Sequence, residues 1–427
     1  MAGTTRFPFS KVYIPMKKSV IAAVLLSVCL SAGAQDNTSI QFKPYGFIRN
    51  YLVIDSRESV YGTEDFFYYV PKDVKMVNGD DLNQMTTVSY GAITSRLGLD
   101  VSGYQVNGWN VGAKFEGDFY AGVSGVTGTA LFRLRQAYLT LGKNGFNLKV
   151  GQGWHPMAAD MPHIFSLNTG APFGPFSRTP EVVMDGKLSD SVTLTAAAIW
   201  QMQYTSAGPE GASANYIKYG GIPEIYLGLS LKQGGFTGRV GVDMLSIRPR
   251  HLNDAGTARV SDRITTFSPF AFAEYTKGLF SIKAKTIFAQ AGEHMNLNGG
   301  YGVSAVLSNG SWEYTPTRNS STWLSLTYGK KVQGVLFAGY VRNFGSAKEV
   351  VGDLYFSKNS FSNKNRMFRI TPELMLNWGK VTLGLEYELT GIQYGSFSKT
   401  AKNFGLATEN LHWVCNNRIQ VMLRYSF

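Results

Sequence analysis

The chain has 427 residues, of which 44% are hydrophobic and only 16% are charged, and it contains 47 glycines, 23 tyrosines and 27 phenylalanines. Abundant glycine and aromatic residues with few charges are typical of an all-β architecture and argue against a helical one. Basic residues outnumber acidic ones by 41 to 29. They are not gathered into the basic and aromatic motifs of nucleic-acid binding, so no nucleic-acid partner is expected.

Residues 1–34 have the pattern of a secretory signal peptide. Lys17 and Lys18 precede an apolar run, and Ala32-Gly33-Ala34 supplies the small residues of a cleavage site. Met16, just before the lysines, is an alternative start. Cleavage after Ala34 leaves residues 35–427 as a single predicted domain with 37 basic and 29 acidic residues, a formal charge of +8. Cys415 is then the only cysteine, which excludes an intramolecular disulfide.

Short segments of alternating hydrophobicity, separated by turn residues, fill the rest of the chain. We count them by their period of two and by the glycine, asparagine and aspartate residues of the turns between them. Sixteen strands are predicted, over residues 40–55, 95–104, 109–120, 130–142, 146–153, 180–188, 191–204, 223–232, 236–247, 262–276, 279–291, 321–330, 334–344, 364–378, 380–393 and 414–427.

The connections between these strands alternate strictly between long and short. The long ones are 56–92, 121–129, 154–179, 205–222, 248–261, 292–320, 345–363 and 394–413. Such sorting is the rule for transmembrane β-barrels, because only meandering neighbours can pair every backbone group in lipid. The sequence therefore predicts an all-β fold, a 16-stranded antiparallel transmembrane β-barrel with short periplasmic turns, long extracellular loops and both termini on the periplasmic side.

Alternation also gives each strand an apolar and a polar face. In the second strand Leu97 and Leu99 oppose Arg96 and Asp100, and most other strands repeat the pattern. The alternation lapses near residues 136–139 and 267–272. An apolar outer face with a polar inner face predicts a wet interior, and a barrel of sixteen strands is wide enough to enclose an aqueous channel.

The predicted inner face carries more basic than acidic side chains. The basic ones are Arg49, Arg96, Lys114, Arg133, Arg135, Lys149, Lys187, Lys232, Arg239, Lys283, Lys285, Arg369, Arg418 and Arg424. The acidic ones are Asp100, Glu116, Asp118, Glu181, Asp185, Asp243, Glu373, Glu386 and Glu388. A basic excess in a water-filled lumen concentrates anions and disfavours cations, so small anionic solutes are the expected cargo.

The position of these charges sharpens the expectation. Residues Arg96, Arg133, Arg135 and Lys149 come from neighbouring strands and should form one basic wall, whereas Glu386 and Glu388 lie on a distant strand. Opposed walls of this kind would create a transverse field across the lumen. The alternative is that the charges pair with one another only to keep a polar interior satisfied.

Residues 154–179 form an unusual long loop, with five prolines and three phenylalanines counted from Pro156 to Pro180. A loop this stiff and apolar is unusual for a segment in solvent.

No metal, cofactor or catalytic site is predicted. His155 and His163 with Asp160 lack a third ligand at a recognised spacing. Asp73, Asn78, Asp80 and Asp81 lack the regular spacing of a calcium loop. All five histidines lie in predicted loops without an obvious nucleophile, which disfavours an enzyme.

Four short motifs carry a resemblance to a known family. They are Ser95-RLGLDVSG, Lys114-FEGDF, Arg133-LRQAYLTL and Leu148-KVGQGWHP, and the chain ends on the aromatic residue Phe427. In order and rough spacing they resemble the Gram-negative trimeric porins, most of all DcaP-like porins and their relatives in Bacteroidetes. In such porins the loop after the fifth strand folds into the barrel and narrows it. The resemblance therefore implies that residues 154–179 constrict the pore, with Asp160, Arg178 and Glu181 as constriction residues; the alternative is a loop that caps the barrel from outside. The terminal aromatic residue resembles the signal read by the barrel assembly machinery.

The resemblance implies a homotrimer in the bacterial outer membrane, in contact with lipid and lipopolysaccharide. The expected function is an outer-membrane porin for passive diffusion of small hydrophilic solutes, with a preference for anions. A phosphate- or substrate-selective porin is an alternative that would show a ladder of aligned basic residues. A barrel enzyme and an adhesin are less favoured, the latter because the loops are neither very long nor repetitive.

Overall fold

The computed structural model describes residues 39–427 except 63–64, 120–121, 124–125, 358–362 and 398–403. The predicted signal peptide, residues 1–34, lies outside the described residues. The chain divides into residues 1–39 and 40–427, and every strand and helix given below belongs to the second unit. Within the described residues, no helix is long and apolar enough to cross a membrane.

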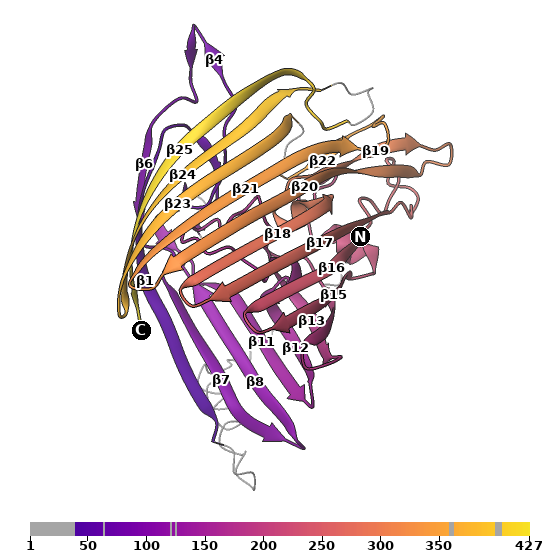
Figure 1. Ribbon diagram of the computed structural model, residues 1–427. Helices are drawn as coiled ribbons and strands as arrows, with labels where there is room; N and C mark the ends of the chain where they lie inside the picture. The colour runs from indigo at the N-terminus through magenta and orange to yellow at the C-terminus, as the bar shows by residue number, and fades with distance from the viewer. Residues whose placement is uncertain (1–38, 63–64, 120–121, 124–125, 358–362, 398–403) are drawn as a thin grey trace, which may run out of the picture. The chain divides into compact units, whose positions relative to one another are not determined.

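Sixteen antiparallel strands form a closed barrel (Figure 1). They are β1 (Gln41–Asp55), β7 (Arg96–Val106), β8 (Trp109–Asp118), β11 (Arg133–Lys143), β12 (Phe146–Trp154), β13 (Arg178–Lys187), β14 (Val192–Ile199), β15 (Glu224–Gln233), β16 (Phe236–Ile247), β17 (Ile264–Lys277), β18 (Phe280–Gln290), β20 (Trp312–Gly329), β21 (Val332–Ser346), β23 (Lys364–Trp378), β24 (Val381–Ser396) and β25 (Glu409–Ser426). Each pairs with its neighbours in this order, and β1 pairs with both β7 and β25. The predicted 16-stranded barrel is confirmed.

Shorter elements belong to the long connections. They are β2 (Ser59–Tyr61), β3 (Tyr68–Pro71), β4 (Met76–Val77), β5 (Asp80–Asp81), β6 (Thr87–Gly91), β9 (Gly122–Val123), β10 (Val126–Ala130), η2 (Pro156–Ala158), α2 (Asn215–Gly220), η3 (Gly292–Met295), β19 (Gly300–Val306) and β22 (Leu354–Phe356). Some barrel strands also run further than predicted: β20 begins at Trp312 instead of residue 321, and β25 at Glu409 instead of residue 414. The added segments, WEYTPTRNS and ENLHW, lack a clear period of two, so the sequence does not mark them as strands.

The strands turn their apolar side chains outward. In β25, Ile419, Leu423 and Tyr425 are exposed, whereas Arg418 and Gln420 between them are buried inside the barrel. Backbone groups paired all around the ring and an apolar outer belt are the two requirements for crossing a bilayer with strands. The chain is thus built as a transmembrane barrel.

Protein segments fill more of the barrel interior than the polar inner face of the strands led us to expect. Parts of two long loops, residues 65–71 and 155–177, pack against the inner wall in one apolar cluster. From the loops the cluster takes Phe67, Phe173 and Phe176, and from the wall Trp323 and Phe272. Inward-facing Phe270 and Phe272 explain the lapse of alternation near residues 267–272, because an aromatic wall faces an aromatic loop.

Closure of the barrel depends on tight contact at the chain's end. The Phe427 and Gly46 backbones exchange two hydrogen bonds, of 3.1 and 3.3 Å. A Cβ at Gly46 would lie 2.6 Å from the Arg96 carbonyl oxygen and 2.7 Å from the Phe427 ring. Only glycine therefore lets the terminal aromatic ring lie flat on β1.

We expect Gly46→Val to reduce the yield of folded barrel, because the backbone of β7 cannot move aside and overpacking costs about 1–3 kcal/mol. The fraction of protein that migrates as the folded, heat-modifiable form on a cold SDS gel measures this. Gly334→Val in β21 is the control, since a Cβ there meets nothing within 4 Å. Equal folded fractions for the two variants would show that the close packing of Gly46 against Phe427 and β7 is not needed for folding.

Candidate channel interior and its charge network

A cavity of about 820 Å³ lies inside the barrel, between the wall and the inserted loops. Its lining combines cationic and aromatic side chains. Those of the first strands and of the two loops include Arg49, Arg96, Asp118, Arg133, Arg135, Phe67, Tyr69, Trp154, Phe165, Phe176 and Tyr204. Eight of the predicted pore-lining residues do not line it: Lys114, Glu116, Lys149, Asp160, Arg178, Glu181, Glu386 and Glu388.

The arginines of this wall are interleaved with two carboxylates. Arg135 donates from Nε to Glu116 Oε1 at 2.7 Å and from Nη1 to Asp118 Oδ2 at 2.8 Å. Arg133 Nε lies 2.7 Å from Asp118 Oδ1, and Arg96 Nη1 lies 3.6 Å from Glu116 Oε2. The expected basic wall is therefore a mixed network in which arginine predominates.

A shift in strand register explains this network. The pairing of β11 with β8 shifts between Leu134 and Gln136, which is the mark of a β-bulge. The bulge places the neighbouring side chains of Arg135 and Gln136 both in the interior, where each donates to Glu116. It also accounts for the lapse of alternation near residues 136–139.

Two further arginines add positive charge without a carboxylate partner. Arg49 donates to Thr94 Oγ1 at 3.1 Å and lies over the rings of Phe47 and Tyr51. Buried Arg178 lies 4.8 Å from the ring centre of Trp154. Among the described residues, no carboxylate lies within 4 Å of either guanidinium. Five arginines thus face two carboxylates in this region of the wall.

Other predicted pore residues are paired in ways that favour the alternative of mutual neutralisation. Lys114 contacts Asp100, and Lys149 Nζ lies 2.7 Å from Glu181 Oε1. Asp160 Oδ1 lies 3.2 Å from Arg239 Nη1. These pairs keep the inner face polar but add little net charge.

Glu386 and Glu388 on β24 hold the inserted loop instead of facing open space. Ser166 N–H donates to Glu386 Oε2 at 3.3 Å, and Asn168 Nδ2 donates to Glu388 Oε2 at 3.2 Å. Both glutamates are fully buried. The acidic side of the barrel therefore binds residues 155–177, and its carboxylates are not free to create the predicted opposing wall.

The loop 155–177 is fastened to the barrel along its length. The Phe165 carbonyl accepts from Tyr51 of β1 at 2.7 Å, the Ala171 carbonyl accepts from Arg369 of β23 at 2.9 Å, and the Met157 carbonyl accepts from Lys285 of β18. Contacts to strands on several sides of the barrel place this loop inside and not over the mouth.

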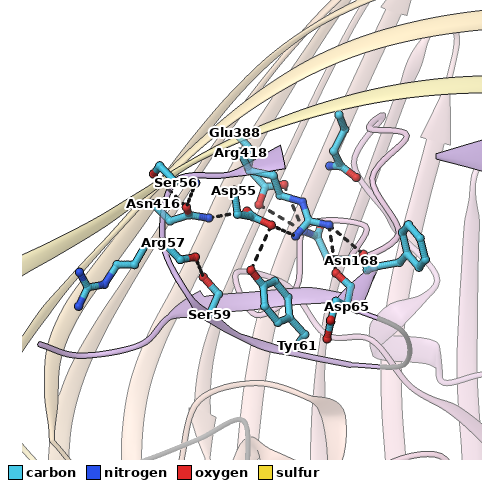
Figure 2. A network of polar contacts seen from close by, with 12 residues as sticks. Asp55, Ser56, Arg57, Ser59, Tyr61, Asp65, Asn168, Glu388, Asn416 and Arg418 are labelled. Atoms are coloured by element: carbon cyan, nitrogen blue, oxygen red, sulfur yellow. Dashed lines mark hydrogen bonds and ion pairs between the residues drawn. The ribbon is translucent and has the colours of Figure 1, made fainter. Parts of the chain in front are cut away.

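The first long loop is inserted too, and Figure 2 shows its anchor. Arg418 of β25 pairs with Asp55 at 3.2 Å and donates to the Phe66 carbonyl at 3.3 Å. Asn416 and Tyr61 donate to the two oxygens of Asp55, at 2.7 and 3.1 Å. The buried Asp55–Arg418 pair is thereby surrounded by hydrogen bonds and ties residues 65–66 to the wall.

Arg369 of β23 joins both loops. Its Nη2 donates to the Tyr69 carbonyl at 2.7 Å and its Nη1 to the Ala171 carbonyl at 2.9 Å, while Nε lies 3.2 Å from Glu388. The period-two pattern placed Arg369 and Arg418 on the inner face. It could not show that their guanidinium groups donate hydrogen bonds to loop carbonyls. The aromatic run at residues 66–69, unusual in a solvent loop, was the one available signal of insertion.

Comparisons with known proteins agree with this architecture. No family model and no curated protein matches the chain. Among solved structures, the outer-membrane channel DcaP of Acinetobacter baumannii shares 18% identity and a TM-score of 0.66, over 93% of this chain and 100% of that one. The fold is that of an outer-membrane porin.

Two more porin-fold structures extend the likeness. The anion-selective porin from Comamonas acidovorans is 12% identical, with a TM-score of 0.53, over 91% of this chain and 100% of that chain. OmpT of Vibrio cholerae is 12% identical, with a TM-score of 0.51, over 93% of this chain and 100% of that chain. At these identities the likeness establishes the fold, and the function has to be argued from the interior of this barrel.

We expect Arg369→Met to lower the midpoint temperature of unfolding strongly, because it leaves Glu388 buried without its cation and removing one partner of a buried pair costs about 3–5 kcal/mol. The double variant Arg369→Met/Glu388→Met should recover part of the loss. Heat-modifiable gel migration across a temperature series measures both midpoints. Arg366→Met, on the same strand but exposed, is the control and should leave the midpoint unchanged. If Arg369→Met were as stable as this control, Arg369 would not be what holds the two loops to the wall.

Proposed function

We propose that the protein is an outer-membrane porin, a water-filled channel through which small hydrophilic solutes diffuse, with a preference for anions. The observation that carries the proposal is the arginine-rich wall of the cavity, where Arg49, Arg96, Arg133 and Arg135 outnumber the carboxylates that pair with them, Glu116 and Asp118. An uncompensated positive charge inside a narrow, low-dielectric wall raises the local concentration of anions and lowers that of cations.

The arginines without carboxylate partners contribute most to this preference. Charge within an ion pair is largely neutralised at the distance of a passing solute, so Arg133 and Arg135 matter less per residue than their number suggests. Arg49 lines the cavity and is satisfied by a hydroxyl and two rings, which leaves its charge uncompensated. We propose Arg49, together with the exposed part of Arg133, as the main determinant of selectivity.

We further propose that residues 155–177 act as the constricting loop. Their attachment to β1, β18, β23 and β24 supports this role, because a loop held on several sides narrows the passage without closing it by its own motion. Asp160, Arg178 and Glu181 then lie beside the narrowed region, with Asp160 and Glu181 neutralised by their basic partners.

Location and assembly follow from the same proposal. We propose insertion into the bacterial outer membrane, with lipid and lipopolysaccharide around the apolar belt and recognition of the terminal strand by the assembly machinery. A homotrimer is proposed because OmpT of Vibrio cholerae, which shares the fold, is described in a trimer form. We propose no catalytic activity.

Anion preference is tested by the reversal potential of the purified protein in a planar bilayer under a potassium chloride gradient. The wild type should pass chloride more readily than potassium. The variant Arg49→Gln/Arg133→Gln should shift the permeability ratio toward potassium, whereas Lys331→Gln, in an exposed turn, should leave it unchanged. Cation selectivity of the wild type, or an unchanged ratio in the double variant, would count against the arginine wall.

Replacing residues 163–174 with a short glycine–serine linker should raise single-channel conductance, because it removes material from the interior while keeping both ends of the loop. Removing residues 254–257 from an exposed loop tip is the matched control and should leave conductance as it is. Folding of both variants is checked by heat modifiability. Equal conductance in a folded linker variant would show that the loop does not constrict the channel.

A further inference from the structure

Four buried side chains from separate parts of the chain meet near the long-loop end of the barrel. Glu224 begins β15, Asp243 lies in β16, His155 follows β12, and His294 lies in η3. His155 Nε2 lies 2.7 Å from Glu224 Oε1 and 3.9 Å from Asp243 Oδ1, and His294 Nε2 lies 3.1 Å from Glu224 Oε1. All four are at most 2% exposed. Both histidines therefore contact the same oxygen of Glu224, and His155 also lies near Asp243.

The two carboxylates of this cluster lack compensation. Glu224 Oε2 and Asp243 Oδ1 are buried and accept no hydrogen bond from the described residues. No lysine or arginine of the described chain lies within ion-pair distance of either group, and histidines are their only basic neighbours. Buried carboxylates are normally paired or bound to a metal, since an isolated buried charge is very costly. Even with His294 protonated, one of the two carboxylates has no counter-charge, so the cluster is short of one positive charge.

The two imidazoles have different roles, set by their other ring nitrogens. Met157 N–H donates to His155 Nδ1 at 3.0 Å, so His155 Nε2 carries the hydrogen and donates to Glu224. His294 Nδ1 lies 3.1 Å from the Ala291 carbonyl oxygen and Nε2 lies 3.1 Å from Glu224 Oε1; both oxygens accept, so both ring nitrogens donate, and Nε2 would exchange its hydrogen for a bound ion while Nδ1 keeps its carbonyl. A backbone carbonyl that fixes the tautomer in this way is the usual outer contact of a metal-binding histidine.

We propose that Glu224, Asp243 and His294 bind one divalent transition-metal ion of the zinc class, with His155 as the positioning residue that orients Glu224. One ligand atom each from His155, Glu224 and Asp243 lies within 4.8 Å of the others, so the two carboxylates converge, and His294 Nε2 lies 3.1 Å from Glu224 Oε1; binding one ion would draw His294 toward Asp243. Mixed imidazole and carboxylate ligands suit zinc, whereas calcium and magnesium take oxygen ligands. A divalent ion would neutralise the two carboxylates in a region that excludes water.

The ion would tie two loop segments to the paired strands β15 and β16, where Tyr226 lies opposite Asp243 in the ladder. His155 starts the loop 155–177, and His294 lies in the loop between β18 and β19. The site therefore has a structural role at the long-loop end of the barrel. It does not depend on the proposed anion preference, and its test uses no measurement of transport.

Metal content of the folded, detergent-purified protein tests the proposal. After incubation with zinc chloride and removal of free metal by gel filtration, elemental analysis should find about one zinc per chain, as expected for a closed protein site. Cobalt(II) should replace zinc and give a visible absorption band. Glu224→Gln and Asp243→Asn should each lower affinity at least about 10-fold, as the loss of metal-site groups does. His251→Gln, an exposed loop histidine, is the control and should bind as the wild type does.

Two results would overturn the proposal. A folded wild type that retains no stoichiometric zinc and shows no cobalt band would mean that protons shared among the carboxylates and histidines supply the missing charge. Zinc retention that is unchanged in folded Glu224→Gln and Asp243→Asn would place the metal elsewhere. Since the wild-type measurements need no substitution, the test remains decisive even where a variant fails to fold.

Discussion

The pairing of β1 with β25 is the constraint on which the rest of the structure depends. In lipid, an unpaired strand edge leaves backbone groups without partners at a cost of several kcal/mol each. The sixteen strands must therefore close, and closure is completed where Phe427 lies on Gly46. Once the ring is closed, its diameter follows from the number of strands, and an interior wider than its own side chains can fill is unavoidable.

That interior is organised by a few buried arginines. Arg369 and Arg418 use their planar, multiply donating guanidinium groups to bind loop carbonyls and wall carboxylates together, which a lysine could not reproduce. The backbone carbonyls of an inserted loop need donors, and the wall supplies them. The long loops can leave water and enter the barrel because these donors are already in place on the strands.

The period of two made the barrel predictable, because it records which side of each strand meets lipid. It places Arg369, Glu388 and Arg418 on the inner face. It does not identify the loop residues that they bind, because the position of an inserted loop leaves no periodic pattern in the sequence. The bulge that turns both Arg135 and Gln136 inward interrupts the period without revealing its cause. Glu224 and Asp243 lie on the paired strands β15 and β16, but His155 and His294 reach them only because their loops fold inward, so the cluster was beyond prediction.

The same side chains that stabilise the interior also determine its electrostatic field. An arginine paired with a carboxylate, such as Arg135 with Glu116 and Asp118, gives rigidity and little net potential. An arginine satisfied by hydroxyls and aromatic rings, such as Arg49 or Arg178, keeps its charge. The proposed anion preference thus rests on how many arginines the fold satisfies without carboxylates, and counting basic residues on the inner face overestimates the net positive charge.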